Sequence, residues 1–342
     1  MLRGVKCYLI ADIEYKNMKV GVTGATGHIG ANLVRDLLKY GHDVRVLVRN
    51  GKDIFNGLNV EYVKGDLLDI KSLNKFCKGL DVVEHLAASI SIGGDTFKNV
   101  YEVNVIGTQN VLNACRNANV RRFIHFSSIH AMSHIPLNEV MDENRPLQLN
   151  SKSTYEKTKA IAEQWVLEQN TKTFEVLVLN PTAVVGPYDF KPSFIGRFIL
   201  MLYKGRIPAI IPGGYDWVDV RDISMAAVNA ITMGAPGQKF ILSGKWREIQ
   251  DFADIISTFN GKKHNIPVIP LWMAKMGLPF MSFGNKIMGK SPLYTLESLN
   301  ILQHCNNHIS SNKAVKELNY SARPLEDTLR DTLLWFKKMS YF

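Results

Sequence analysis

MKVGVTGATGHIG, residues 18–30, is the stretch that decides the fold. A short β-branched run leads directly into three glycines, Gly24, Gly27 and Gly30, and a helical pattern follows from His28. Gly24 permits a tight turn, Gly27 allows a close backbone approach to a diphosphate, and Gly30 lets the helix pack on the sheet. The free N–H groups and positive end of the helix would then face the diphosphate. The stretch predicts a dinucleotide site formed by Gly24, Thr26, Gly27, His28, Ile29 and Gly30.

Around this stretch, short β-branched runs alternate with helical patterns. Such alternation is typical of a parallel sheet that is covered by helices on both faces. The predicted fold class is therefore α/β, a Rossmann doubly wound parallel sheet with a smaller C-terminal substrate-binding lobe. The expected strands are 18–23, 43–48, 60–63, 81–86, 121–127, 174–179 and 239–244, and the expected helices are 28–40, 70–79, 98–117, 153–169, 222–233 and those within 311–338.

The same patterns predict how the chain divides. We expect residues 18–187, with a return segment 216–243, to form the cofactor-binding unit. Residues 188–215 and 244–342 are expected to form the substrate-binding lobe. Residues 1–17 carry acidic side chains and lack both a long apolar core and a small-residue cleavage site. They are therefore predicted to be an N-terminal extension and not a signal peptide.

Composition narrows the class of protein further. The 46% hydrophobic content is ordinary for a globular protein, and no apolar run reaches the ~18–20 residues of a membrane-spanning helix. The four cysteines lie far apart without a CxxC pair, which predicts reduced thiols and a cytoplasmic location. The formal charge of +10 comes with no basic run or recognition-helix signature. We therefore expect no nucleic-acid partner, and an anionic cofactor or substrate instead.

The end of the second expected strand bears on the choice of cofactor. An acid at this place commonly bonds the adenosine ribose of NAD, but Val48 stands there, followed by Arg49 and, close behind, Lys52. A guanidinium matches a 2′-phosphate in charge and geometry. NADP(H) is therefore predicted as the preferred cofactor, with NAD(H) possible. The alternative interpretation is that Arg49 is a solvated loop residue.

Two further segments fit the same site. Asp66 and Leu67 follow the third expected strand, where an adenine edge would lie. Leu86, Ala87 and Ala88 follow the fourth, where small residues admit the cofactor. Both segments could also be ordinary strand ends, so they support the cofactor site only together with the glycine turn.

A second group of residues indicates catalysis. Ser128 ends the fifth expected strand, and Tyr155 and Lys159 follow at helical i, i+4 spacing, which puts the ammonium beside the phenol. A nearby positive charge is expected to lower the pKa of Tyr155 toward the working range of a general acid. Ser128 can hydrogen-bond a carbonyl oxygen that gains charge during hydride transfer. The alternative is that a YxxxK pair marks only an exposed helix face.

The ordered motifs TGATGHIG, HLAA, NVIGTQNVLNAC, FSS, YEKTK and NPTAVVGP resemble the extended short-chain dehydrogenase/reductase superfamily, also called the NAD-dependent epimerase/dehydratase family. The runs NPTAVVGPYDFKPS and SARPLEDTLRDTLLWF are most similar to its branch of dihydroflavonol-4-reductase-like and 3β-hydroxysteroid dehydrogenase-like enzymes. The similarity covers nearly all of residues 18–338.

The resemblance implies roles for matching residues. Ser128 would polarise the carbonyl, Tyr155 would donate the proton, and Lys159 would tune the tyrosine and hold the nicotinamide ribose. The residues expected to border the nicotinamide are Pro181, Thr182 and Val184. The resemblance also implies a homodimer joined through the helices near 98–117 and 153–169.

Two departures from the family pattern bear on the reaction. Asn180 stands where epimerases and dehydratases commonly have Arg. Ile129 and His130 occupy the positions of the Asp–Glu acid–base pair of sugar dehydratases. Since dehydration needs an acid and a base beyond the tyrosine, Ile129 and His130 at these positions argue against a dehydratase.

The leading hypothesis is NADP(H)-dependent reduction of a ketone or aldehyde to an alcohol, or the reverse reaction. Two alternatives stay open, a nucleotide-sugar epimerase with bound NAD and a redox-sensing NADP-binding regulator without catalysis. The segment 266–294 is rich in Met, Phe, Leu and Trp without an acid, which favours an apolar or aromatic substrate. No metal is expected, because no fourth ligand accompanies His304, Cys305 and His308. His130 and His134 have the helical spacing of metal ligands, but Pro136 ends any helix soon after His134.

Overall fold

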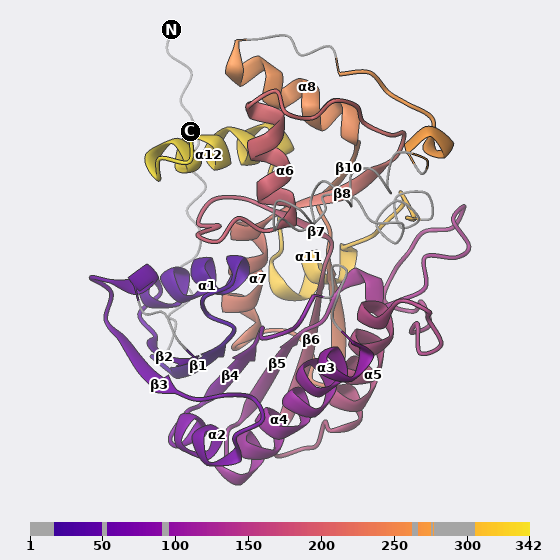
Figure 1. Ribbon diagram of the computed structural model, residues 1–342. Helices are drawn as coiled ribbons and strands as arrows, with labels where there is room; N and C mark the ends of the chain where they lie inside the picture. Colours follow the sequence, from indigo (N-terminus) through magenta and orange to yellow (C-terminus); the bar gives the residue numbers. More distant parts are fainter. Residues whose placement is uncertain (1–16, 50–52, 91–95, 262–265, 275, 277–304) are drawn as a thin grey trace, which may run out of the picture.

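The computed structural model describes residues 17–49, 53–90, 96–261, 266–274, 276 and 305–342. Its larger unit is a seven-stranded parallel sheet in the order β3-β2-β1-β4-β5-β6-β9 (Figure 1). The strands are β1 (Lys19–Thr23), β2 (Asp43–Val48), β3 (Val60–Lys64), β4 (Val82–His85), β5 (Arg122–Phe126), β6 (Glu175–Pro181) and β9 (Gln238–Leu242). Because the strand order runs outward in both directions from β1, the sheet is doubly wound. The predicted fold class is confirmed.

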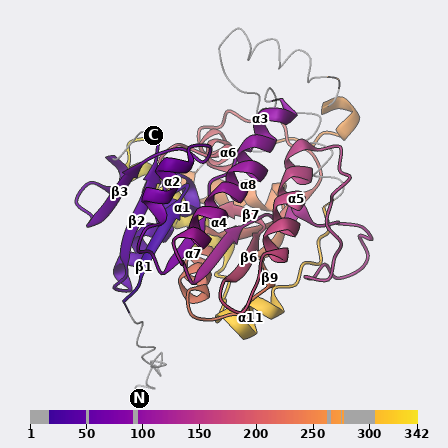
Figure 2. The same ribbon diagram turned by 90° about the horizontal axis from the view of Figure 1, so that it is seen from below.

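Helices cover both faces of this sheet, as the view from below in Figure 2 shows. On one face lie α1 (His28–Lys39), α7 (Val220–Ala230) and α11 (Asn312–Leu318). The other face is covered by α2 (Ile70–Cys77), α4 (Gly107–Asn117) and α5 (Thr154–Glu168). Alternate strand residues supply the two cores: Leu177 and Leu179 of β6 join the first, and Val176 and Val178 join the second.

The expected helix 98–117 is interrupted by a wider turn. α3 (Phe97–Tyr101) continues through the π-helix η2 (Glu102–Ile106) into α4. A π-helical turn inserts an extra residue and so changes which side chains face the sheet. Here the side chain of Asn104 accepts from the N–H of Ser89 (2.7 Å) and donates to Thr158 Oγ1 (3.1 Å). The turn therefore joins the segment after β4 to α5.

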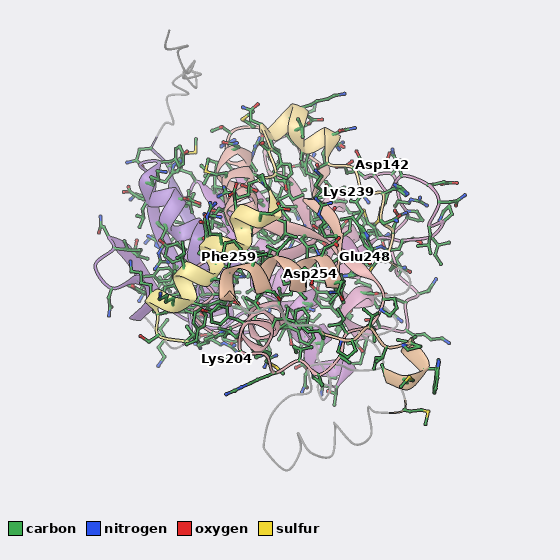
Figure 3. The ribbon with its side chains drawn as sticks, turned by 90° about the horizontal axis from the view of Figure 1, so that it is seen from above. Asp142, Lys204, Lys239, Glu248, Asp254 and Phe259 are labelled. Atoms are coloured by element: carbon green, nitrogen blue, oxygen red, sulfur yellow. The ribbon has the colours of Figure 1, made fainter. Side chains whose placement is uncertain are left out.

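The smaller lobe is built on a three-stranded sheet, β10-β8-β7. Its strands are β7 (Ala183–Val185), β8 (Gly214–Asp219) and β10 (Lys245–Glu248), and its helices are α6 (Phe194–Tyr203), α8 (Ile249–Asn260) and α12 (Leu325–Lys338). One buried cluster joins them, with Trp217, Phe252 and Phe336 among its large side chains. Figure 3 shows this lobe from above, with Asp254 and Phe259 on the outer side of α8. The sequence patterns did not predict this small sheet. Two short 3-10 segments complete the larger unit, η1 (Asp53–Phe55) and η3 (Ile129–Ala131).

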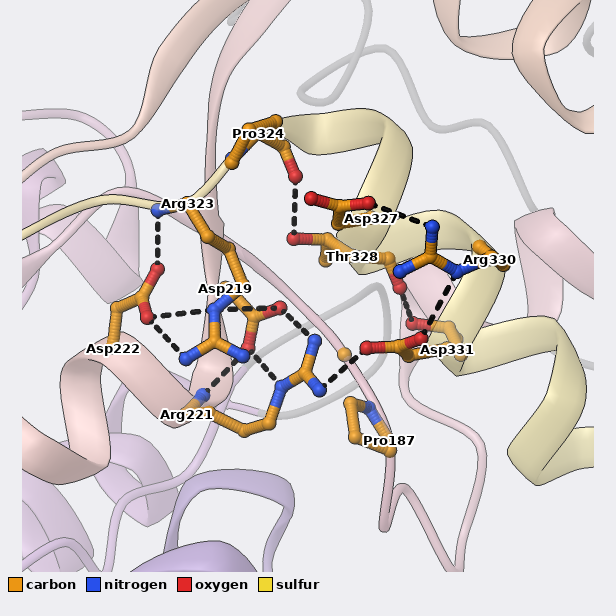
Figure 4. Close-up of polar contacts among 12 residues, drawn as sticks. Pro187, Asp219, Arg221, Asp222, Arg323, Pro324, Asp327, Thr328, Arg330 and Asp331 are labelled. Atoms are coloured by element: carbon orange, nitrogen blue, oxygen red, sulfur yellow. Dashed lines mark hydrogen bonds and ion pairs between the residues drawn. The ribbon is translucent and has the colours of Figure 1, made fainter. Parts of the chain in front are cut away.

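An ion-pair network fastens α12 to the junction of β8 and α7 (Figure 4). Arg221 bridges Asp219 and Asp331, with 2.7 Å between paired atoms in each case. Arg323 pairs with Asp222 at 2.6 Å. Asp219 and Asp222 are buried. The charges of the guanidinium groups therefore offset the cost of removing these carboxylates from water.

The helix–strand unit that was expected to return to the sheet is present as α7 and β9. β8 pairs with β7 and β10 in the smaller sheet, and α11 packs against α7 and β9. Residues 1–16, and 277–294 of the apolar segment, lie outside the described residues. The domain boundaries therefore stay a prediction. No helix in the described ranges is both long and apolar enough to cross a membrane.

Candidate active site

The turn between β1 and α1 is shaped by close backbone contacts. Gly24 has φ +68°, and a Cβ added to it would lie 2.6 Å from the amide nitrogen of Ala87. A Cβ on Gly30 would lie 2.4 Å from the carbonyl oxygen of Gly24. Gly27 precedes α1 and gives it no side-chain cap, so the first N–H groups are left for an anion. The turn fits the diphosphate of a dinucleotide.

The side chain of His28 has a structural partner. Its Nε2 lies 3.0 Å from the carbonyl oxygen of Gly186 and 3.1 Å from that of Pro187, so Nε2–H is the donor. Asn32 also donates to the Pro187 carbonyl oxygen (3.0 Å). The first turn of α1 is therefore joined to the chain that follows β7, where the two units meet.

Ser128 and Tyr155 meet at the carboxyl end of β5. The Ser128 hydroxyl accepts a hydrogen bond from the N–H of His130 (3.2 Å) and is also hydrogen-bonded to Tyr155. Tyr155 is the second residue of α5, whose N-terminus is capped by Ser153. Burial raises the pKa of Tyr155, and the bond with Ser128 acts in the opposite direction. The predicted fall in the pKa of Tyr155 is wrong for this structure, in which burial is the largest influence on that pKa.

Lys159 is held by a backbone carbonyl in the same region. Its Nζ donates to the carbonyl oxygen of Phe126 at 2.6 Å, and the side chain is buried. Burial lowers the pKa of Lys159 to about 8, while the charge of Glu163 acts to raise it. Glu163 lies one turn further along α5, and its side chain is completely buried.

Glu163 belongs to a buried network behind Ser128, Tyr155 and Lys159. Asn180 donates to Glu163 Oε2 (2.7 Å) and to the carbonyl oxygen of Ser128 (3.1 Å). Lys239 Nζ lies 3.6 Å from Glu163 Oε1. The network joins the helix of Tyr155 and Lys159 to the loop of Ser128. Sequence reasoning missed Glu163, although its i+4 spacing from Lys159 could have indicated it.

A cavity of about 560 Å³ runs along these groups. Of the predicted site residues, it is lined by Gly24, Gly27, His28, Ile29, Gly30, Leu86, Ala88, Ser128, Tyr155, Lys159, Pro181, Thr182 and Val184. Its apolar wall comes from the smaller lobe: Phe194, Ile195, Phe198, Tyr215, Trp217, Trp246 and Ile249. Within the described part of the chain, Lys159 is the single Lys or Arg in the lining.

The remaining predicted cofactor residues lie outside this lining. They are Thr26, Arg49, Asp66, Leu67 and Ala87. Arg49 is exposed at the end of β2, and Asp66 accepts from the N–H of Leu68 (3.0 Å). Lys52 lies outside the described residues. The roles of all these residues stay predictions.

The lining also contains polar groups, and Asp216 among them has partners within the protein. Asp216 accepts from Thr182 Oγ1 (2.7 Å) and from the N–H of Gly244 (2.6 Å). His130 and His134 also line the cavity. Among the residues the structure describes, no group of three or more His, Cys, Asp or Glu side chains is arranged to hold a metal ion.

The doubly wound sheet, the glycine turn and the Ser–Tyr–Lys set define an enzyme of the extended short-chain dehydrogenase class. Residues 20–242 match the model of the NAD dependent epimerase/dehydratase family, and the chain belongs to that family. The resemblance stated from the motifs is confirmed, because relatives named for dihydroflavonol 4-reductase and 3-beta-hydroxysteroid dehydrogenase also match. The family and these relatives indicate NAD(P)-dependent oxidoreduction.

Individual matches span almost the whole chain. Sterol demethylase protein B of Methylococcus capsulatus is 31% identical over 321 residues, which are 93% of this chain and 98% of that protein. The crystal structure of gox2253 is 31% identical with a TM-score of 0.81, over 95% of this chain and 99% of that one. A nucleoside-diphosphate-sugar epimerase from Pseudomonas aeruginosa has a TM-score of 0.77 at 23% identity, over 96% and 100% of the chains. This last likeness shows the fold alone.

Proposed function

We propose that the protein is an NADP(H)-dependent oxidoreductase that interconverts a ketone and an alcohol on an apolar ring compound. The observation that carries the proposal is the apolar wall of the cavity beside Tyr155 and Ser128, with Lys159 as the single cation among the described lining residues. A steroid-like or flavonoid-like substrate fits such a wall. The relatives named for sterol and 3-beta-hydroxysteroid chemistry support the same substrate class.

The cofactor would lie along the glycine turn, with its diphosphate on the N-terminus of α1. Arg49 is exposed at the end of β2 and would pair with a 2′-phosphate. Pro181 and Val184 would border the nicotinamide. When bound, the reduced cofactor supplies a hydride to the carbonyl carbon of the substrate.

The chain's own residues would handle the proton and the developing charge. Ser128 hydrogen-bonds the carbonyl oxygen and stabilises the negative charge that forms there. Tyr155 donates its phenolic proton to that oxygen as the hydride reaches the carbon, so the carbonyl becomes an alcohol. Lys159, fixed by the Phe126 carbonyl, stabilises the phenolate that remains. A proton from solvent then restores Tyr155.

The two alternatives have less support. A nucleotide sugar carries a diphosphate, which needs a cationic clamp, and the described lining offers only Lys159. A regulator without catalysis has no use for the Tyr155–Lys159 arrangement. We therefore favour the reductase over both.

The test compares substrates and cofactors on the purified protein. We expect NADPH oxidation with a 3-keto steroid or a flavanone, and no reaction with UDP-glucose. Activity on the nucleotide sugar alone would overturn the assignment.

Tyr155→Phe tests the chemistry directly. It removes the proton donor and little cofactor contact, so turnover should fall by at least about 100-fold while NADPH binding, followed by fluorescence, stays nearly unchanged. Retained turnover in this variant would mean that another residue protonates the substrate.

We further propose that the protein works in the cytoplasm as a homodimer. The thiols of Cys77 and Cys115 are buried and free, with 3.7 Å between the sulfurs. Two adjacent free thiols are in keeping with a reducing compartment. Cell fractionation checks the location.

A further inference from the structure

Two histidines follow Ser128 and line the cavity. His130 belongs to η3, and His134 comes four residues later. Their ring centroids are 5.3 Å apart. The N–H of His130 donates to Ser128 Oγ (3.2 Å), so the pair adjoins the group that is proposed to hold the reacting oxygen.

The hydrogen bonds fix which nitrogen of His134 carries the proton. The N–H of Asn306 donates to Nδ1 of His134 (3.3 Å), so in the neutral ring Nε2 carries the hydrogen. Nε2 is buried and has no hydrogen-bond partner within the described part of the chain. His134 as a whole residue is only 9% exposed. His134 therefore holds a donor in an apolar cavity wall.

His130 is similar. Its Nδ1 is buried and has no hydrogen-bond partner in the ranges that the structure describes. Burial lowers the pKa of His130 to about 3, and the neighbouring His134 acts in the same direction. Burial, followed by the charge of Arg145, lowers the pKa of His134 to about 4. Both rings are therefore neutral at physiological pH. His134 offers the donor at Nε2, and the Nδ1 of His130 offers a donor or an acceptor, depending on the tautomer.

Buried polar groups without partners are destabilising, and folded proteins rarely keep them without a function. We propose that His130 and His134 form a second recognition point, which binds a hydrogen-bonding oxygen that the apolar substrate carries near its reacting carbon. The inference rests on the proposed function and narrows the substrate to ring ketones or alcohols with a neighbouring hydroxyl or keto oxygen. A neutral pair suits an uncharged oxygen better than a phosphate, which needs cations.

Equilibrium binding tests the inference independently of turnover. The probes are two matched pairs, flavanone with 3-hydroxyflavanone and cholestan-3-one with 4-hydroxycholestan-3-one, added to the NADP+-loaded protein. We expect the hydroxylated member of at least one pair to bind about tenfold more tightly or better. Equal binding within both pairs, or no binding of any probe, would overturn the inference.

The variants assign the preference to the histidines. His130→Phe keeps an aromatic ring and removes both ring nitrogens. The preference for the hydroxylated probe over its matched partner should therefore fall by about tenfold. His308→Phe is the matched control, because His308 is exposed and outside the cavity lining. It should keep the preference. If His134→Phe fails to fold after losing its bond from Asn306, His130→Phe decides alone, and a preference that survives in it overturns the inference.

Turnover of the same probes separates the two proposals. If the wild type prefers the hydroxylated member but turns over none of the probes with NADPH, the proposed function fails and the recognition point stands. Turnover of the probes without any preference would support the proposed function and overturn the recognition point.

Discussion

The ammonium group of Lys159 is buried near the carboxylate of Glu163. The carboxylate of Glu163 favours its charged form, while burial lowers its pKa to about 8. If the ammonium is the active form, activity should decline as pH rises through this value. Glu163→Gln removes the favourable charge and should lower the pKa of Lys159 further. We therefore expect the alkaline limb of the pH–rate profile to move to lower pH.

The control is Glu168→Gln, at an exposed position at the end of the same helix. It should leave the alkaline limb where it is. If Glu163→Gln keeps the alkaline limb of the wild-type pH–rate profile and lowers only the maximal rate, Glu163 has a purely structural role.

The side chain of Arg49 is predicted to make the protein bind NADPH more tightly than NADH. Loss of one charge-assisted contact is worth about 1.5–3 kcal/mol. Arg49→Ala should therefore weaken NADPH binding by roughly 10- to 150-fold and leave NADH binding nearly unchanged. Titration calorimetry measures both, with the exposed Lys338→Ala as control. Equal affinity of the wild type for the two cofactors would contradict the prediction.

At the scale of elements, the ion pairs between α7, α12 and the segment before α12 hold the smaller lobe in place. Arg323 compensates the buried Asp222, so Arg323→Ala should cost about 1–3 kcal/mol in the free energy of unfolding. Arg330 pairs with Asp327 at 2.8 Å, and both side chains are nearly half exposed. Arg330→Ala should therefore cost less than about 1 kcal/mol. Urea unfolding measures the free energy of unfolding of both variants. Equal losses would contradict the prediction that the buried ion pairs contribute more stability than the exposed one.

At the scale of the whole molecule, we predict a homodimer joined through α3–α4 and α5. Gln164 is exposed on α5, and Gln164→Arg would bring two like charges together near the axis of such a dimer. Light scattering at micromolar concentration should show a dimer for the wild type and a larger monomer fraction for the variant. Thr258→Arg, exposed on α8, should stay dimeric. A monomeric wild type would refute the prediction.

The sequence by itself determined the larger unit, because its signals are local. Most strands of the large sheet are short runs rich in β-branched or apolar residues. The crossover helices have apolar residues at helical spacing. The glycine turn and the Tyr155–Lys159 pair are also local, since a turn and an i, i+4 spacing fix which groups lie side by side. These features could therefore be predicted from the order of the residues alone.

Only the tertiary structure shows which residues surround the glycine turn and the Tyr155–Lys159 pair. β7, β8 and β10 are short strands whose pairing partners are distant in the chain, so no local period predicted them. The bond from Asn180 to Glu163 and the apolar wall of α6 and β8 join residues far apart in sequence. The pKa of Tyr155 rises where the spacing indicated a fall, because burial depends on everything packed around a group, whereas spacing reports only its neighbours along one helix.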